Sequence, residues 1–140
     1  MDAAKFRQEY WRDVKESFIT DNVNMGPKRK KFIAELVRNN NIKSVLELGC
    51  CSGGNLKVIR EECPDIKIVG FDINERAIKH AKEIEKIDAE FELGSLYDLS
   101  RFKDKSFDLV FTCAVLVHIP SDKSRGIVSD MKRISNKFMF

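Results

Sequence analysis

The segment from Val45 to Asn55 constrains the fold of this chain more than any other. It reads Val-Leu-Glu-Leu-Gly-Cys-Cys-Ser-Gly-Gly-Asn, a short apolar run with one acid that passes into small residues and then into a helical pattern. This order predicts a buried strand that ends in a tight loop feeding the N-terminus of a helix. Open α/β sheets bind nucleotide-like ligands at such loops, at the carboxyl ends of their strands. The segment therefore predicts both a sheet and the place of a ligand site.

Downstream of this loop, strand-like and helix-like segments alternate. Strands are predicted at 45–48, 66–71, 89–93 and 107–111, with the start of a fifth at 137–140. Asn74 and Ser121 are placed to cap two of the intervening helices. Strands separated by helices form right-handed crossovers and a parallel sheet. The prediction is an α/β fold with a doubly wound, Rossmann-like parallel sheet of about five strands, in the order 3-2-1-4-5, with 89–93 at an edge. The helix positions expected to face the core are Phe32, Ile33, Leu36 and Val37, then Ala77, Ile78, Ala81 and Ile84, and finally Ile127, Val128, Met131 and Ile134.

The chain divides into an N-terminal helix and cap, residues 1–26, and a core, residues 27–140. Between positions 3 and 19 an apolar stripe with a spacing of four predicts one amphipathic helix made of Phe6, Tyr10, Val14 and Phe18, with Trp11 beside it. Tyr10, Trp11 and Phe18 suit either a cap over the ligand site or plain packing of this helix. The break at 21–26 precedes Pro27, which is typical of a first helical position.

Charge and cysteine usage exclude several classes. The net charge is +3, and the one dense basic run, Lys28–Lys31, is interpreted as a solvated helix face, so a nucleic-acid partner is not expected. The four cysteines have no zinc spacing, so no metal site is expected and a reducing compartment is favoured. No signal-peptide pattern or membrane-spanning apolar run is present, which predicts a cytoplasmic protein with no membrane partner.

Three loops at strand ends carry the candidate site. A dinucleotide fingerprint needs glycine at position 51, where this chain has Cys51, so NAD or FAD binding is disfavoured though a nicotinamide-dependent oxidoreductase stays open. Asp72 ends the second strand 23 positions after Gly49, which suits a carboxylate that accepts hydrogen bonds from ribose; helix capping is the alternative. Ser95 and Leu96 follow the third strand, where they suit either a purine site or a plain turn.

With these motifs in order, residues from about 30 to 140 resemble the class I S-adenosylmethionine-dependent methyltransferases. Residues 47–53 resemble the acid-x-Gly-x-Gly-x-Gly motif, 71–73 the ribose-binding acid with its apolar neighbour, and 106–110 with 115–120 the fourth-strand motif and its loop. Cys51 in place of the middle glycine requires a loop conformation that Cys tolerates. Ser95 stands where many members carry Asp.

The resemblance implies a cofactor site for S-adenosylmethionine, with S-adenosylhomocysteine as product. Glu47, Gly49 and Gly53 would shape the methionyl pocket, Asp72 would bind ribose, and Ile73 would pack on adenine. Ser95 and Leu96 would contact the base, and Cys113 would lie beside the sulfonium. The complete implied cofactor set is Glu47, Gly49, Cys50, Cys51, Gly53, Asn55, Asp72, Ile73, Ser95, Leu96, Cys113 and Leu116.

The expected function is S-adenosylmethionine-dependent methyl transfer to a small molecule. A further likeness of residues 53–56, 115–120 and 135–138 to methyltransferases associated with surface sugars, such as pseudaminic acid, suggests a sugar intermediate. His118 is the candidate base, with a hydrogen bond to loop backbone as the alternative, and Asn22 and Asn24 are candidates for the acceptor mouth. The family fold continues for two more strands, so the core is expected to be incomplete. The alternative is therefore a non-catalytic cofactor-binding core that needs a partner chain, or a second copy, over the edge of the fifth strand.

Overall fold

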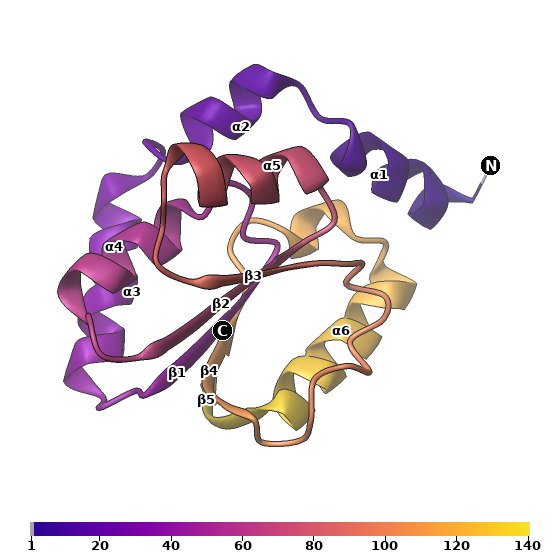
Figure 1. The fold of residues 1–140 in the computed structure, drawn as a ribbon. Coiled ribbons are helices and arrows are strands. Elements are labelled where there is room, and N and C mark those ends of the chain that lie inside the picture. The colour runs from indigo at the N-terminus through magenta and orange to yellow at the C-terminus, as the bar shows by residue number, and fades with distance from the viewer. Residues whose placement is uncertain (1) are drawn as a thin grey trace.

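The computed structural model describes residues 2–140, which form one five-stranded sheet flanked by helices (Figure 1). The strand order is β3-β2-β1-β4-β5 and every pairing is parallel, which confirms the predicted fold class and order. The elements are α1 (Ala3–Arg12), α2 (Glu16–Asn22), α3 (Pro27–Asn39), β1 (Ser44–Leu48), α4 (Gly54–Glu62), β2 (Lys67–Asp72), α5 (Glu75–Lys79), the π-helical turn η1 (His80–Ile84), β3 (Glu90–Leu93), β4 (Phe107–Phe111), the 3-10 turn η2 (Leu116–His118), α6 (Ser121–Ile134) and β5 (Ser135–Met139).

Two apolar layers cover the sheet. On one face, α3, α4 and α5 pack against β1 and β2 through residues such as Val37, Ile59 and Ile78. On the other face, α6 and the loop around Leu99 and Phe102 pack against the same strands. Because β1 lies between two strands and between both layers, four of its five residues are buried. This burial explains why its buried residues are apolar except for Glu47.

The strand boundaries differ slightly from the prediction. β2 begins and ends one residue later than expected, so Asp72 is its last residue. β3 lies at the edge of the sheet, as predicted, next to β2. β5 begins at Ser135, directly after α6, and pairs with β4 across a register shift between Phe107 and Leu109.

The predicted single helix over residues 3–19 is wrong. The chain leaves the helix at Asp13 and re-enters one at Glu16, so the N-terminal segment is two helices. Because of this turn, Val14 and Phe18 do not extend the face of Phe6 and Tyr10. Phe6 and Tyr10 are more than half exposed, whereas Val14 is buried.

Three positions expected in the core are on the surface. The π-helical turn η1 contains one extra residue per turn, which rotates Ile84 outward and leaves it 67% exposed. Phe32 and Val128 are exposed as well. Phe32 precedes the buried Ile33 and Val128 follows the buried Ile127, and one residue along a helix turns the side chain by about 100°. Ser121 is the first residue of α6 rather than its cap. Pro120 occupies the cap position, and no side chain in the described part of the chain caps this helix.

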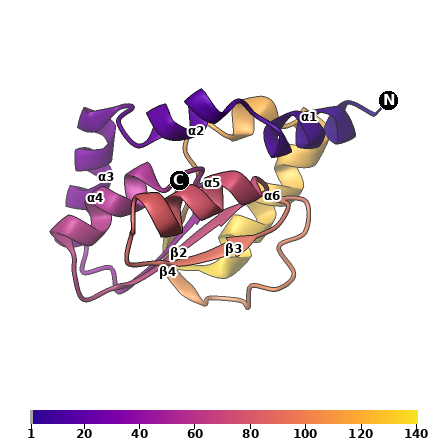
Figure 2. The same ribbon diagram turned by 45° about the horizontal axis from the view of Figure 1, so that its top comes forward.

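The N-terminal helices lie across the carboxyl ends of the strands (Figure 2). Side chains of the core donate hydrogen bonds to backbone carbonyls of these two helices. Asn74 Nδ2 donates to Trp11 O at 2.9 Å, and Ser52 Oγ donates to Ile19 O at 2.7 Å. Lys30 donates to the carbonyls of Asn22 and Val23 and is only 3% exposed. The predicted solvated face of Lys28–Lys31 is therefore wrong at Lys30. Within residues 2–140, no helix has the length and apolarity needed to cross a membrane.

Candidate ligand pocket

A pocket of about 350 Å³ is lined by residues of α1 and α2 and by residues at the carboxyl ends of β1, β2 and β4. It contains ten of the twelve residues assigned to the cofactor from sequence. Gly53 and Leu116 do not line it: Gly53 precedes α4, and Leu116 packs against the α6 side of the core. The ten lining residues are Glu47, Gly49, Cys50, Cys51, Asn55, Asp72, Ile73, Ser95, Leu96 and Cys113.

The loop after β1 uses left-handed backbone at three positions. Gly49 and Gly53 have φ angles of 80° and 78°, and Cys51 has a φ of 49°. This conformation costs a residue with a side chain about 1–2 kcal/mol, so Cys51 occupies a conformation that favours glycine. Gly49 N and Cys50 N donate to Phe71 O at 2.7 and 3.1 Å, which fixes the loop against β2.

Gly49→Ala is expected to destabilise the protein. A Cβ at this position would lie 2.5 Å from Val115 Cγ2 and would force a left-handed alanine. We expect the free energy of unfolding, measured with urea, to fall by about 2 kcal/mol or more. Gly126→Ala in α6 is the control: nothing lies within 4 Å of its Cβ position, so it should raise stability by about 0.5–1 kcal/mol. Equal stability of the Gly49→Ala variant and wild type would contradict the loop geometry.

The carboxylate of Asp72 joins two of the pocket loops. Its Oδ2 accepts a hydrogen bond from Cys51 N and its Oδ1 accepts one from Asn74 N, both at 2.8 Å. Asn74, as predicted, caps α5: its Oδ1 accepts from Ala77 N at 3.0 Å. Burial raises the pKa of Asp72, and these backbone bonds oppose the rise. The carboxylate therefore holds the loop after β1 beside the loop after β2.

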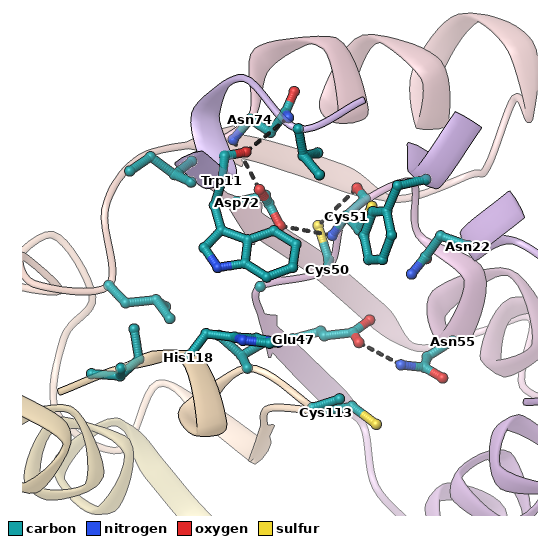
Figure 3. Close-up of a pocket in the computed structure, with 18 of the residues that line it drawn as sticks. Trp11, Asn22, Glu47, Cys50, Cys51, Asn55, Asp72, Asn74, Cys113 and His118 are labelled. Atoms are coloured by element: carbon teal, nitrogen blue, oxygen red, sulfur yellow. Dashed lines mark hydrogen bonds between the residues drawn. The ribbon is translucent and has the colours of Figure 1, made fainter. Parts of the chain in front are cut away.

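Glu47 is a buried acid with an incomplete set of partners. Asn55 Nδ2 donates to Glu47 Oε1 at 2.5 Å (Figure 3). Glu47 Oε2 and Asn55 Oδ1 are buried with no hydrogen-bond partner among residues 2–140. Burial raises the pKa of Glu47 to about 8, against the opposing effect of the Asn55 bond. At neutral pH the carboxyl group is therefore largely protonated.

Aromatic side chains close the pocket from the side of the N-terminal helices. Trp11 contacts His118 in η2, with ring centroids 4.5 Å apart (Figure 3). The ring centroids of Trp11 and Phe18 are 5.5 Å apart. Trp11, Phe18 and Asn22 line the pocket, whereas Tyr10 and Asn24 do not. No hydrogen bond joins the His118 ring to loop backbone in the described chain, so its ring contacts Trp11 instead of holding the loop.

The Ser95 side chain is hydrogen-bonded to α1. Its Oγ donates to Gln8 Oε1 at 2.9 Å and accepts from Tyr97 N at 3.2 Å. Arg7, Gln8 and Arg29 also line the pocket, although no sequence motif singles them out. Arg7, Gln8 and Trp11 occupy one face of α1 at helical spacing, so the position of Trp11 was the available signal for the other two.

The cysteines are free thiols. Burial raises the pKa of Cys51 to about 12 and also raises the pKa of Cys113, so both are protonated at neutral pH. Within residues 2–140, no group of three or more His, Cys, Asp or Glu side chains is arranged to hold a metal ion.

Comparison with known proteins places this architecture in a family. A family model described as "Methyltransferase domain" matches residues 45–137. Demethylmenaquinone methyltransferase from Thermotoga maritima is 29% identical over 110 residues, which cover 79% of this chain and 46% of that protein. The chain thus spans about half the length of this curated relative.

Two solved structures show the same fold. Magnesium protoporphyrin IX methyltransferase from Synechocystis PCC 6803 with bound SAM has a TM-score of 0.74 at 16% identity, covering 97% of this chain and 73% of that one. The PH0226 protein from Pyrococcus horikoshii OT3 has a TM-score of 0.70 at 24% identity, covering 94% and 63%.

Proposed function

The chain belongs to the methyltransferase domain family, and we propose that it binds S-adenosylmethionine in the pocket beneath α1 and α2 and transfers the methyl group to a small molecule. The observation that carries this proposal is the presence of two acids in one cavity, the buried Glu47 and the half-buried Asp72. Glu47 lies near the end of β1 and Asp72 ends the adjacent β2. The two groups suit the two polar parts of the cofactor, its amino acid and its ribose.

The unpartnered atoms near β1 fit the cofactor's ammonium group. Glu47 Oε2 and Asn55 Oδ1 are buried without a hydrogen-bond partner among residues 2–140. Asn55 Oδ1 is an acceptor, Glu47 Oε2 becomes one when the carboxyl group ionises, and an ammonium has three N–H donors. A buried acceptor left without a donor costs about 1–3 kcal/mol. An ammonium placed between these side chains would remove that cost and would favour ionised Glu47.

The end of β2 fits the adenosine part. Each oxygen of Asp72 accepts one backbone hydrogen bond and keeps a lone pair for a ribose hydroxyl. Ile73 and Leu96 supply apolar surface in the same pocket for the base. The Ser95 hydroxyl is already bonded to Gln8, so an adenine amino group would have to share it.

The residues around this site would act mainly by alignment. Bound S-adenosylmethionine supplies an electrophilic methyl group on sulfur with a good leaving group. Positioning two reactants can contribute about 7–11 kcal/mol to lowering a barrier. Cys113, Val115 and His118 line the same pocket and would exclude water around the methyl group. We assign His118 as the base for acceptors that keep a proton during attack, because its ring borders the pocket.

Methyl transfer is tested directly with S-adenosylmethionine labelled in its methyl group. The purified chain is incubated with the labelled cofactor and a small-molecule extract that includes nucleotide sugars. Label in a small-molecule product, lost in the Asp72→Ala variant, supports the proposal and identifies the acceptor. A sugar-linked product would support the sugar hypothesis.

A non-catalytic cofactor-binding core is the second candidate. It is supported by β5, which within residues 2–140 pairs only with β4 and leaves Phe138 43% exposed. Mass measurement in solution separates the two candidates. A monomer that transfers label rules out the second candidate, whereas cofactor binding with label transfer only after a partner chain is added favours it.

A further inference from the structure

The hydroxyl group of Tyr97 is a buried polar atom without a partner at the wall of the pocket. Tyr97 lies in the turn after β3 and lines the pocket, and its buried hydroxyl oxygen forms no hydrogen bond with any of residues 2–140. Burial raises the pKa of Tyr97, so the hydroxyl keeps its proton at neutral pH. It can therefore donate one hydrogen bond and accept another. An unpaired buried hydroxyl is unfavourable for the folded chain, so a ligand that pairs it gains affinity.

The surrounding chain fixes the position of this side chain. Tyr97 N donates to Ser95 Oγ at 3.2 Å, and Ser95 Oγ donates in turn to Gln8 Oε1 on α1 at 2.9 Å. The Tyr97 ring packs against the apolar layer on the α6 side of the sheet, as does Ile119. Ile119 follows His118, which we assign as the base, and both line the pocket. Tyr97 therefore belongs to the same side of the pocket as the loop after β4.

The cofactor does not need this hydroxyl for its amino-acid part. The buried side-chain atoms without a partner in residues 2–140 are Glu47 Oε2, Asn55 Oδ1 and the Tyr97 hydroxyl. The first two are assigned above to the ammonium group, and Asp72 is assigned to ribose. Asn55 is carried by α4, which covers one face of the sheet, whereas Tyr97 packs on the other face. The hydroxyl is thus available to a second molecule in the pocket.

Aromatic and aliphatic side chains surround the space for this second molecule. Trp11 and Phe18 line the pocket from the N-terminal helices, and the ring centroid of Trp11 is 4.5 Å from that of His118. With the cofactor groups assigned, the Tyr97 hydroxyl is the one buried unpaired polar atom left in the described chain. A sugar brings several hydroxyl groups that each need a partner when buried. A flat aromatic molecule needs a partner for only one polar group, and its rings suit an aromatic wall.

We propose that the methyl acceptor is a flat aromatic molecule with a hydroxyl group, and that Tyr97 binds this hydroxyl by a hydrogen bond. This assignment rests on the proposed function, to which it adds the chemical class of the acceptor and one residue that selects it. Tyr97 selects by pairing, because an aromatic molecule without the hydroxyl leaves the tyrosine oxygen unpaired.

Fluorescence titrations of protein saturated with S-adenosylhomocysteine test this pairing. The two probes are 2-naphthol and naphthalene, which has the same rings without the hydroxyl. The variants are Tyr97→Phe and, as the matched control, Tyr10→Phe, which loses the same group from an exposed position of α1 outside the pocket. Calorimetric titration with S-adenosylhomocysteine measures the cofactor affinity of each variant, and thermal unfolding without ligand measures its stability.

Wild type is expected to bind 2-naphthol about three- to tenfold more tightly than naphthalene. Tyr97→Phe should remove this preference and should bind S-adenosylhomocysteine within twofold of wild type. Without ligand, Tyr97→Phe should raise the melting temperature by about 2–8 °C, because it deletes an unpaired buried hydroxyl. Tyr10→Phe should match wild type in all three measurements.

Several results would overturn the assignment. Weaker S-adenosylhomocysteine binding by Tyr97→Phe would give the hydroxyl to the cofactor, and a lower melting temperature would give it a structural role. A preference for 2-naphthol that survives in Tyr97→Phe, or that is lost equally in Tyr10→Phe, would remove the selection from Tyr97. Equal affinity of wild type for the two probes, no binding of either, or methyl label recovered in a nucleotide sugar would exclude the aromatic class. If wild type binds no S-adenosylhomocysteine, the proposed function itself fails, so the two failures are distinguishable.

Discussion

Replacing Asp72 with alanine is expected to lower the affinity for S-adenosylhomocysteine by about a hundredfold or more. The substitution removes the acceptor of two backbone N–H groups, on Cys51 and Asn74, and the group assigned to ribose. Hydrogen bonds to a charged group contribute about 1.5–3 kcal/mol each, and each 1.4 kcal/mol is a tenfold change in affinity. Calorimetric titration measures the loss.

Two further variants make this result interpretable. Asp65→Ala removes an exposed carboxylate from the turn before β2 and should bind like wild type. Asp72→Asn keeps an acceptor for one of the two N–H groups, so it should weaken binding by less than alanine does. An Asp72→Ala variant that folds and binds within twofold of wild type would remove ribose recognition from this residue.

The free energy of unfolding is expected to fall as pH rises from about 5 to 8. The pKa of Glu47 is about 8 in the folded chain, raised from 4.5, so the native state keeps a proton that the unfolded state releases in this range. Stability falls with pH wherever the native state binds more protons. The fall is expected to be on the order of a few kcal/mol, since one pKa unit corresponds to about 1.4 kcal/mol.

Glu47→Gln isolates this contribution. Glutamine cannot ionise, so the free energy of unfolding of the Glu47→Gln variant should depend much less on pH than that of wild type. The variant should therefore be more stable than wild type at pH 8. Urea unfolding followed by Trp11 fluorescence at several pH values gives the slope. Glu61→Gln, at an exposed position of α4, should keep the wild-type slope. Parallel curves for wild type and Glu47→Gln would contradict the protonated state of Glu47.

The sheet was predictable because its signal is local. The three central strands β1, β2 and β4 are short, mainly apolar runs, and β1 is buried at four of its five positions. The edge position of β3 follows from its alternating pattern. Asp72 and Glu47 could be placed in one site because adjacent parallel strands end at the same edge of the sheet.

The helices were less predictable because packing selects among nearly equivalent patterns. The turn at Asp13 and the π-helical turn at Ile84 each change which side chains face inward, and neither has a strong sequence signal. Arg29 belongs to a basic run that is typical of solvated helices. Its place in the pocket depends on how the turn before α3 fits over α4, which is a tertiary contact.

Calorimetric titration of the wild-type chain with S-adenosylhomocysteine tests the central claim most directly. The pocket predicts saturable binding of one ligand per chain at pH 7, and stronger binding at pH 8, because the ligand's ammonium favours ionised Glu47. NADH, titrated in parallel by fluorescence, should not bind. Absence of S-adenosylhomocysteine binding at millimolar concentration, or saturable binding of NADH in its place, would contradict the account.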